Sequence, residues 1–145
     1  MRTVRHLEKL GGVTVTGWVS DTRPYLDRAE VFVAPLRIAR GVQNKLLEAL
    51  AMGLPCVASL AARSGTQIAD PECILATDDP RQFAEHVIQL LRDAEWRAEL
   101  GRRARAIAET EYRWDVQMAR LDRVIAAAVS QPPPPSVPVC LQSTP

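Results

Sequence analysis

The chain has 145 residues, a formal net charge of +1, and 47% hydrophobic and 24% charged residues. This length allows one domain with a hydrophobic core. The small net charge argues against nucleic-acid binding, which requires a basic face. No apolar run approaches the roughly 20 residues that span a bilayer, and the polar N-terminus does not resemble a signal peptide.

The three cysteines, Cys56, Cys73 and Cys140, are scattered and lack the spacing of a metal site. An odd number of separated cysteines is typical of reduced thiols in a cytosolic protein. We therefore expect a cytoplasmic protein without a metal-ligand cluster.

Short apolar or β-branched runs alternate with helical patterns along the chain. Strands are predicted over residues 13–16, 30–34, 55–59 and 73–76. Helices are predicted over 2–10, through Pro24 and Leu26, over 46–52, from Pro80, through 96–107 and over 114–129. The segment around Ser64-Gly65 is predicted to be a loop, and the proline-rich segment 130–145 an extended, disordered tail.

Alternation of buried strands with helices predicts an α/β fold with a parallel sheet of about four strands and right-handed crossovers. Ligands of such sheets bind beyond the carboxyl ends of the strands. This topology predicts that the loops Gly17 to Asp21, Pro35 to Gln43 and Ser59 to Thr66 share one rim. The groups expected to converge there are Trp18, Arg37, Arg40, the 41–44 amides, Lys45 and Glu48.

The stretch RGVQNKLLEALAMGLPCVAS, from Arg40 to Ser59, combines a glycine-led polar turn with a helix that is apolar on almost every side. Such a helix is expected to be buried, yet it carries Lys45 and Glu48, three residues apart. A buried acid needs a partner. Either Lys45 is that partner, in an ordinary ion pair, or a ligand is, because anions bind at helix N-termini.

These residues carry a resemblance to a known family. The segment GVTVTGWVSDTRPYLDRAEVFVAPLRIARGVQNKLLEALAMGLPCVAS, the DDPRQFAEHVIQLLRD helix, LGRRAR and YRWD resemble the C-terminal half of family 4 glycosyltransferases of the GT-B architecture. Within that family the sequence is most similar to sugar transferases associated with exopolysaccharide and PEP-CTERM/exosortase loci. The resemblance covers roughly residues 4 to 129 and implies a partial Rossmann-like sheet with flanking helices.

The resemblance implies retaining transfer of a sugar from a nucleotide-diphosphate donor to a glycan or lipid-linked acceptor, without an obligatory metal. By position, Gly17, Trp18 and Val19 match the loop that meets the base, and Glu48 matches the acid that holds the ribose hydroxyls. Gly41, Val42 and Gln43 match the turn whose amides face the diphosphate and sugar. Lys45 and Arg40 are the candidate catalytic cations for the leaving diphosphate.

Two departures from the family pattern are visible. The family has two glutamates separated by seven residues; the second matches Glu48, but Arg40 occupies the first position. Arginine cannot accept hydrogen bonds from sugar hydroxyls. The resemblance also begins part-way into the domain. We therefore expect residues 1–129 to be an N-terminally truncated donor-binding domain that lacks its acceptor domain and is inactive alone.

Three alternatives stay open. The first is a stand-alone nucleotide-sugar or phosphate-binding module, without catalysis. Sugar-nucleotide epimerases share the architecture, but no matching set of acid and base residues is found. The arginine-rich helix around residues 92–105 allows a peripheral contact with the inner membrane, although the interspersed Glu95 and Glu99 favour a solvated, salt-bridged face.

Overall fold

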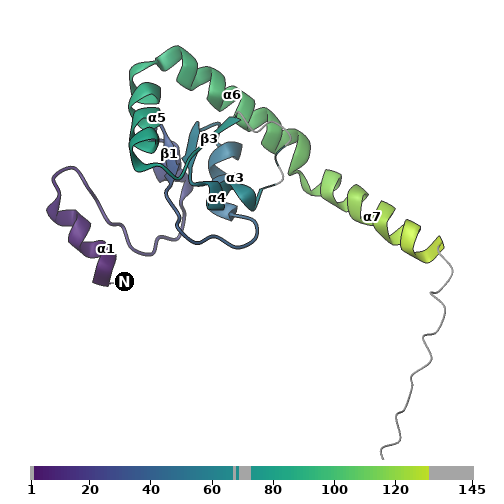
Figure 1. Ribbon diagram of the computed structural model, residues 1–145. Helices are drawn as coiled ribbons and strands as arrows, with labels where there is room; N and C mark the ends of the chain where they lie inside the picture. Colours follow the sequence, from purple (N-terminus) through teal and green to yellow (C-terminus); the bar gives the residue numbers. More distant parts are fainter. Residues whose placement is uncertain (1, 67, 69–72, 131–145) are drawn as a thin grey trace, which may run out of the picture.

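The computed structural model describes residues 2–66, 68 and 73–130 (Figure 1). Its strands are β1 (Phe32–Ala34), β2 (Cys56–Ala58) and β3 (Ile74–Ala76), which form a parallel sheet in the order β1-β2-β3. The helices are α1 (Arg2–Arg5), the 3₁₀ helix η1 (His6–Lys9), α2 (Arg23–Leu26), α3 (Asn44–Ala51), α4 (Leu60–Ser64), α5 (Pro80–Arg92), α6 (Ala94–Glu111) and α7 (Trp114–Ser130).

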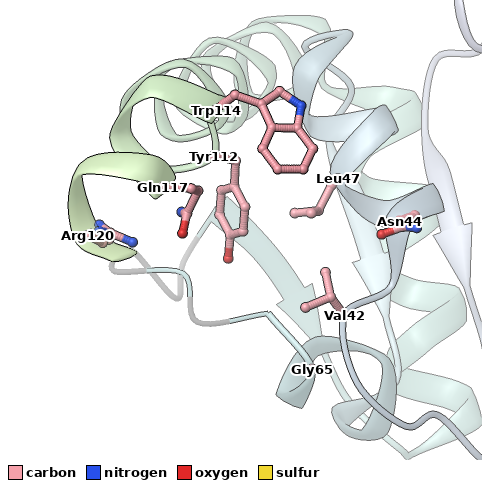
Figure 2. Close-up of a pocket in the computed structure, with 8 residues that line it drawn as sticks. All are labelled: Val42, Asn44, Leu47, Gly65, Tyr112, Trp114, Gln117 and Arg120. Atoms are coloured by element: carbon pink, nitrogen blue, oxygen red, sulfur yellow. The ribbon is translucent and has the colours of Figure 1, made fainter. Parts of the chain in front are cut away.

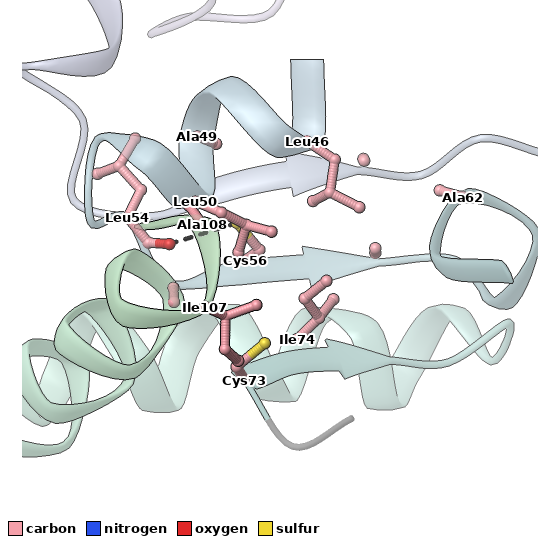
Figure 3. Close-up of a cluster of buried hydrophobic side chains, with 13 residues drawn as sticks. Leu46, Ala49, Leu50, Leu54, Cys56, Ala62, Cys73, Ile74, Ile107 and Ala108 are labelled. Atoms are coloured by element: carbon pink, nitrogen blue, oxygen red, sulfur yellow. Dashed lines mark hydrogen bonds between the residues drawn. The ribbon is translucent and has the colours of Figure 1, made fainter. Parts of the chain in front are cut away.

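Both faces of the central strand, β2, are covered. In the register, Cys56 pairs with Phe32 and Ile74, and all three contribute to a core with α3 and the second half of α6 (Figure 3). The next residue, Val57, faces the opposite side and packs with Leu90 of α5 and Leu100 of α6. Alternate residues of a strand point to opposite faces, so a strand covered on both sides is apolar throughout, as predicted.

Helix α6 packs closely against the turn that ends α3. Gly53 has φ +72°, and the N–H groups of Gly53 and Leu54 donate to the carbonyls of Leu50 and Ala49. This pattern is a Schellman motif, which requires the left-handed conformation that glycine adopts readily. A Cβ atom on Gly101 of α6 would lie 2.2 Å from the Gly53 carbonyl oxygen. The two glycines therefore allow the backbones of α6 and the turn to touch.

The arginine-rich helix is a salt-bridged surface. Arg97 donates to the Leu90 carbonyl at 2.8 Å, closing the corner between α5 and α6. Arg102 pairs with Glu99, and Arg105 pairs with Glu109. Of the two acids, Glu95 and Glu99, on which the sequence analysis based a salt-bridged face, Glu99 forms such a pair. Within the described residues, the helices lack the combination of length and hydrophobicity that a membrane span requires.

The fold class is confirmed, but several element predictions are wrong. Residues 13–16 are not a strand, so the described sheet has three strands rather than about four. The β-branched pattern favours extended backbone, yet a strand also needs a neighbour to pair with. The loop predicted around Ser64-Gly65 contains helix α4, which Ser59 caps by accepting a hydrogen bond from the Ala62 N–H.

Two further corrections concern helices near the candidate site and the end of the chain. Helix α3 begins at Asn44 and is not buried all round, because Leu46, Ala49 and Leu50 are buried whereas Lys45 and Ala51 are exposed. Ser130 ends helix α7 rather than starting the tail, and residues 131–145 lie outside the described part. No residue of α7 is buried.

We predict that Gly101→Ala destabilises the fold by about 1–3 kcal/mol. The added methyl group would overlap the Gly53 carbonyl, which belongs to a backbone turn and cannot move away freely. Chemical denaturation monitored by circular dichroism measures the loss. Gly11→Ala is the control, since a Cβ there has no atom within 4 Å. An unchanged midpoint for Gly101→Ala would contradict the close contact.

We also predict that Cys56 resists alkylation in the folded protein from pH 7 to pH 9. Burial raises the pKa of the Cys56 thiol, with a smaller contribution from the nearby Cys73. Because the thiolate is the reactive form, the native thiol stays unreactive while model thiols gain reactivity over this range. Mass spectrometry of the Cys56 peptide after iodoacetamide treatment, with and without guanidinium, provides the test. Rapid labelling of native protein would show that this strand opens.

Candidate functional site

The amino-terminal half of α3 carries an ion pair. Lys45 Nζ lies 3.1 Å from both carboxylate oxygens of Glu48. Thr22 Oγ1 donates a hydrogen bond to Glu48 Oε2, also at 3.1 Å. The Glu48 side chain is 41% exposed and that of Lys45 is 67% exposed. The expectation that Glu48 is enclosed by apolar residues is therefore wrong, and Lys45 is the partner of the acid in this structure.

The sequence did not identify the role of Thr22. Both Asp21 and Thr22 have side chains that can cap the start of α2, but Thr22 makes no side-chain cap hydrogen bond there. The capping position is served by Asp21, which accepts from the Arg23 N–H at 2.9 Å. Hydrogen bonds from the Arg23 side chain also lower the pKa of Asp21. Thr22 is thereby left to orient the Glu48 carboxylate.

A cavity of about 420 Å³ opens beside this carboxylate and is called the Glu48 cavity below. Its lining is Thr16, Val19, Thr22, Tyr25, Leu26, Phe32, Lys45 and Glu48. The lining combines apolar and aromatic side chains with a carboxylate, an ammonium group and the hydroxyl groups of Thr16, Thr22 and Tyr25. This composition suits a planar ring that carries hydroxyl groups, because apolar walls bury the ring and polar groups fix its orientation.

The turn before α3 leaves the first amides of the helix uncapped by side chains. Gly41 adopts φ +67°, and Gln43 folds its amide back to donate to the Gly41 carbonyl at 3.1 Å. Gln43 therefore makes no side-chain cap hydrogen bond to α3. A Cβ on Gly65, at the end of α4, would lie 1.9 Å from the Gly41 carbonyl oxygen. Contact with Gly65 thus fixes this turn.

A second cavity, called the aromatic cavity below, lies on another side of α3 and measures about 470 Å³. Its lining is Val42, Asn44, Leu47, Gly65, Tyr112, Trp114, Gln117 and Arg120. Figure 2 shows the side chains of the α6–α7 junction facing those of α3 and its preceding turn. This cavity is not evident from the sequence pattern, because its two walls are about 70 residues apart in the chain.

A third cavity, of about 500 Å³, lies at the carboxyl ends of the strands and includes Arg37, Ser59 and Asp78. Several of its polar side chains form hydrogen bonds within the fold. Ser59 Oγ donates to the Leu36 carbonyl at 2.6 Å, and Asp78 accepts from the Leu60 N–H at 2.9 Å. Arg37 is therefore placed apart from Lys45 and Glu48, and the predicted single crevice is instead three separate cavities.

The remaining predicted site residues are distributed as follows. Val19 joins Lys45 and Glu48 in the Glu48 cavity, whereas Val42 lines the aromatic cavity. Trp18 is 85% exposed, and both Trp18 and Arg40 lie outside the linings of all three cavities. The structure thus brings together a subset of the predicted residues around the first turns of α3.

Comparison with known proteins identifies the family. The family model described as "Glycosyl transferases group 1" matches residues 2–93. Among solved structures, sucrose-phosphate synthase from Thermosynechococcus elongatus matches with a TM-score of 0.69 and 26% sequence identity. No curated protein gives a significant match.

The structural match covers 88% of this chain but only 34% of the synthase, so the chain spans about a third of that protein's length. The fold agrees with the parallel α/β architecture that the resemblance implied, and the family model covers more than half of the chain. The chain belongs to the glycosyl transferases group 1 family and has the fold of part of a GT-B glycosyltransferase.

Proposed function

We propose that this chain is the donor-binding part of a retaining glycosyltransferase, which moves a sugar from a nucleotide-diphosphate sugar to a glycan or lipid-linked acceptor. The observation that carries the proposal is the Glu48 carboxylate, held by Thr22 and Lys45 at the edge of an apolar cavity. Membership of a glycosyltransferase family supports the choice of a nucleotide sugar as the ligand.

The nucleoside is proposed to occupy the Glu48 cavity. The base would lie near Val19 and Tyr25, and the ribose hydroxyls would donate to the Glu48 carboxylate. A carboxylate accepts two hydrogen bonds from neighbouring hydroxyls well, and charged acceptors make the stronger hydrogen bonds. The ribose would then compete with Lys45 and Thr22 for the carboxylate oxygens, which are already oriented in the free protein.

The diphosphate is proposed to bind at the start of α3. The amides of Gly41, Val42 and Gln43 and the positive end of the helix macrodipole attract an anion, and no side chain caps the helix. Sugar transfer leaves negative charge on the departing diphosphate. Lys45, released from Glu48 by the ribose, and Arg40 would stabilise that charge, and the proposed transfer needs no metal for this role.

Acceptor recognition is proposed to lie with a second domain or chain, at the cytoplasmic side of the inner membrane, in exopolysaccharide biosynthesis. The chain alone would then bind the donor without transferring its sugar. The alternative function is a nucleotide-sugar-binding module without catalysis, which uses the same cavity. Adding a candidate acceptor-domain protein separates the two, since only the first gives a glycosylated product.

We predict that Glu48→Gln lowers affinity for UDP, or for GDP if that base is preferred, by about tenfold or more. Loss of a charged hydrogen-bond acceptor costs roughly 1.5–3 kcal/mol. Stability should change by less than about 1 kcal/mol, because an exposed ion pair contributes little. Calorimetry measures the binding and chemical denaturation measures the stability.

Glu109→Gln is the matched control, because Glu109 forms an exposed ion pair with Arg105 at 2.8 Å on a different helix. It should leave nucleotide affinity unchanged. Equal losses of affinity and stability in Glu48→Gln would assign Glu48 a structural role. Absence of nucleotide binding by the folded wild-type chain would contradict both candidate functions.

We further predict that Gly65→Ala lowers UDP affinity by at least about tenfold. Gly65 has φ −74°, which alanine adopts without strain, so the effect arises only from overlap of the new Cβ with the Gly41 carbonyl. The displaced turn would carry the amides away from the diphosphate, and misplacement by about 1 Å has large effects on binding geometry. Calorimetry against Gly11→Ala provides the comparison; unchanged affinity would place the diphosphate elsewhere.

A further inference from the structure

The three cavities differ in how the fold uses their polar groups. In the third cavity, Ser59 and Asp78 are bonded to neighbouring backbone, and the Glu48 cavity holds an ion pair. In the aromatic cavity, neither the Asn44 amide nor the Arg120 guanidinium forms a hydrogen bond or ion pair with any residue of the described part. Both groups are available to a ligand.

The same cavity presents aromatic surface. Trp114 is 80% exposed, although an indole side chain usually buries much of its area, and Tyr112 is half-buried beside it. Figure 2 shows both rings on the wall opposite Leu47 and Val42. Aromatic faces bind the apolar C–H faces of a ring, and Gln117 and Asn44 lie around them. Gln117 Nε2 donates to the Glu111 carbonyl, so the Gln117 side-chain oxygen is the group left to accept from a hydroxyl.

The guanidinium of Arg120 favours a ligand that carries a negative charge. Arginine binds carboxylate and phosphate groups through two parallel hydrogen bonds. By contrast, Arg113 at the start of α7 is already engaged by Asp115, with a distance of 2.9 Å. The cavity volume of about 470 Å³ falls in the range of small-ligand sites.

We propose that the aromatic cavity is a second ligand site, which binds a sugar that carries a carboxylate or phosphate group. The ring lies on Trp114 and Tyr112, the hydroxyls meet Asn44 and Gln117, and the anionic group pairs with Arg120. The shared chemistry is an anionic sugar, and its two sources are a uronic acid and a sugar phosphate.

This site is distinct from the proposed nucleoside site. Successive residues of an α-helix point about 100° apart, so Leu47 and Lys45 lie on nearly opposite sides of α3, whereas Asn44 lies one turn before Glu48. The two cavities therefore flank the same helical turns without sharing a lining residue. The inference goes beyond the proposed function, because the second site requires no nucleotide.

The test is a titration of the ¹⁵N-labelled full chain with glucuronic acid, glucose 6-phosphate or glucose, observed through the tryptophan indole N–H signals. Trp114→Phe assigns the Trp114 signal. We expect the two anionic sugars to shift this signal saturably. Glucose should bind with at least about tenfold lower affinity. The tighter of the two anionic sugars identifies the source of the charge.

Arg120→Gln should lower the affinity for the anionic sugars by at least about tenfold, whereas Arg123→Gln on the same helix should leave it unchanged. Arg123 is a matched control because it is exposed and lines none of the three cavities. A Trp114 signal unmoved by the anionic sugars, equal affinity for glucose, or wild-type affinity in Arg120→Gln would each overturn the proposal.

UDP affinity measured on the same variants separates this proposal from the proposed function. Arg120→Gln should bind UDP as the wild type does, and Glu48→Gln should bind the anionic sugar as the wild type does. Failure of the chain to bind UDP, with anionic-sugar binding intact, would remove only the nucleotide proposal. The converse result would remove only the second site.

Discussion

Burial of one face of α3 fixes the positions of the candidate ligand groups that this helix carries, Asn44, Lys45 and Glu48. Leu46, Ala49 and Leu50 are 1%, 0% and 0% exposed and pack against the sheet and α6. Full burial of a leucine side chain contributes roughly 1.5–3 kcal/mol, so rotation of the helix about its axis would be strongly unfavourable. The polar residues on the remaining sides of α3 are thereby held in place without contributing to the core themselves.

Two glycine contacts anchor the ends of this helix. Gly101 admits the Gly53 carbonyl at the carboxyl end, and Gly65 admits the Gly41 carbonyl just before the amino end. Backbone packed against backbone leaves less freedom than contact between flexible side chains. The turn that precedes α3 is therefore positioned before any ligand arrives, which reduces the ordering cost of binding.

The sequence allowed prediction of the features that depend on local pattern. Buried strands, a helix that begins at Pro80 and the parallel α/β class all follow from hydrophobic pattern, the proline at the helix start and alternation of elements. The strand at 13–16 was predicted wrongly because pairing depends on a neighbouring strand. Helix α4 was missed, although Ser59 is a visible capping residue. These errors concern single short elements and leave the architecture unchanged.

The candidate site was harder to predict because it depends on contacts between distant segments. Spacing placed Lys45 and Glu48 on one side of a helix, but it could not show that Thr22 reaches Glu48 across 26 positions of sequence. It also could not show that Trp114 and Asn44 line the same cavity. The exposure of Glu48 was not predicted for the same reason, because an apolar helix pattern does not reveal which side of the helix the preceding loop leaves open.

The central claim is that the first turns of α3 bind a nucleotide diphosphate. A crystal structure of the chain soaked with UDP tests it most directly. We expect the ribose hydroxyls to lie within hydrogen-bonding distance of the Glu48 carboxylate, and the diphosphate oxygens to lie at the amides of Gly41 to Gln43. Uridine bound away from Glu48, or a diphosphate on another part of the surface, would contradict it.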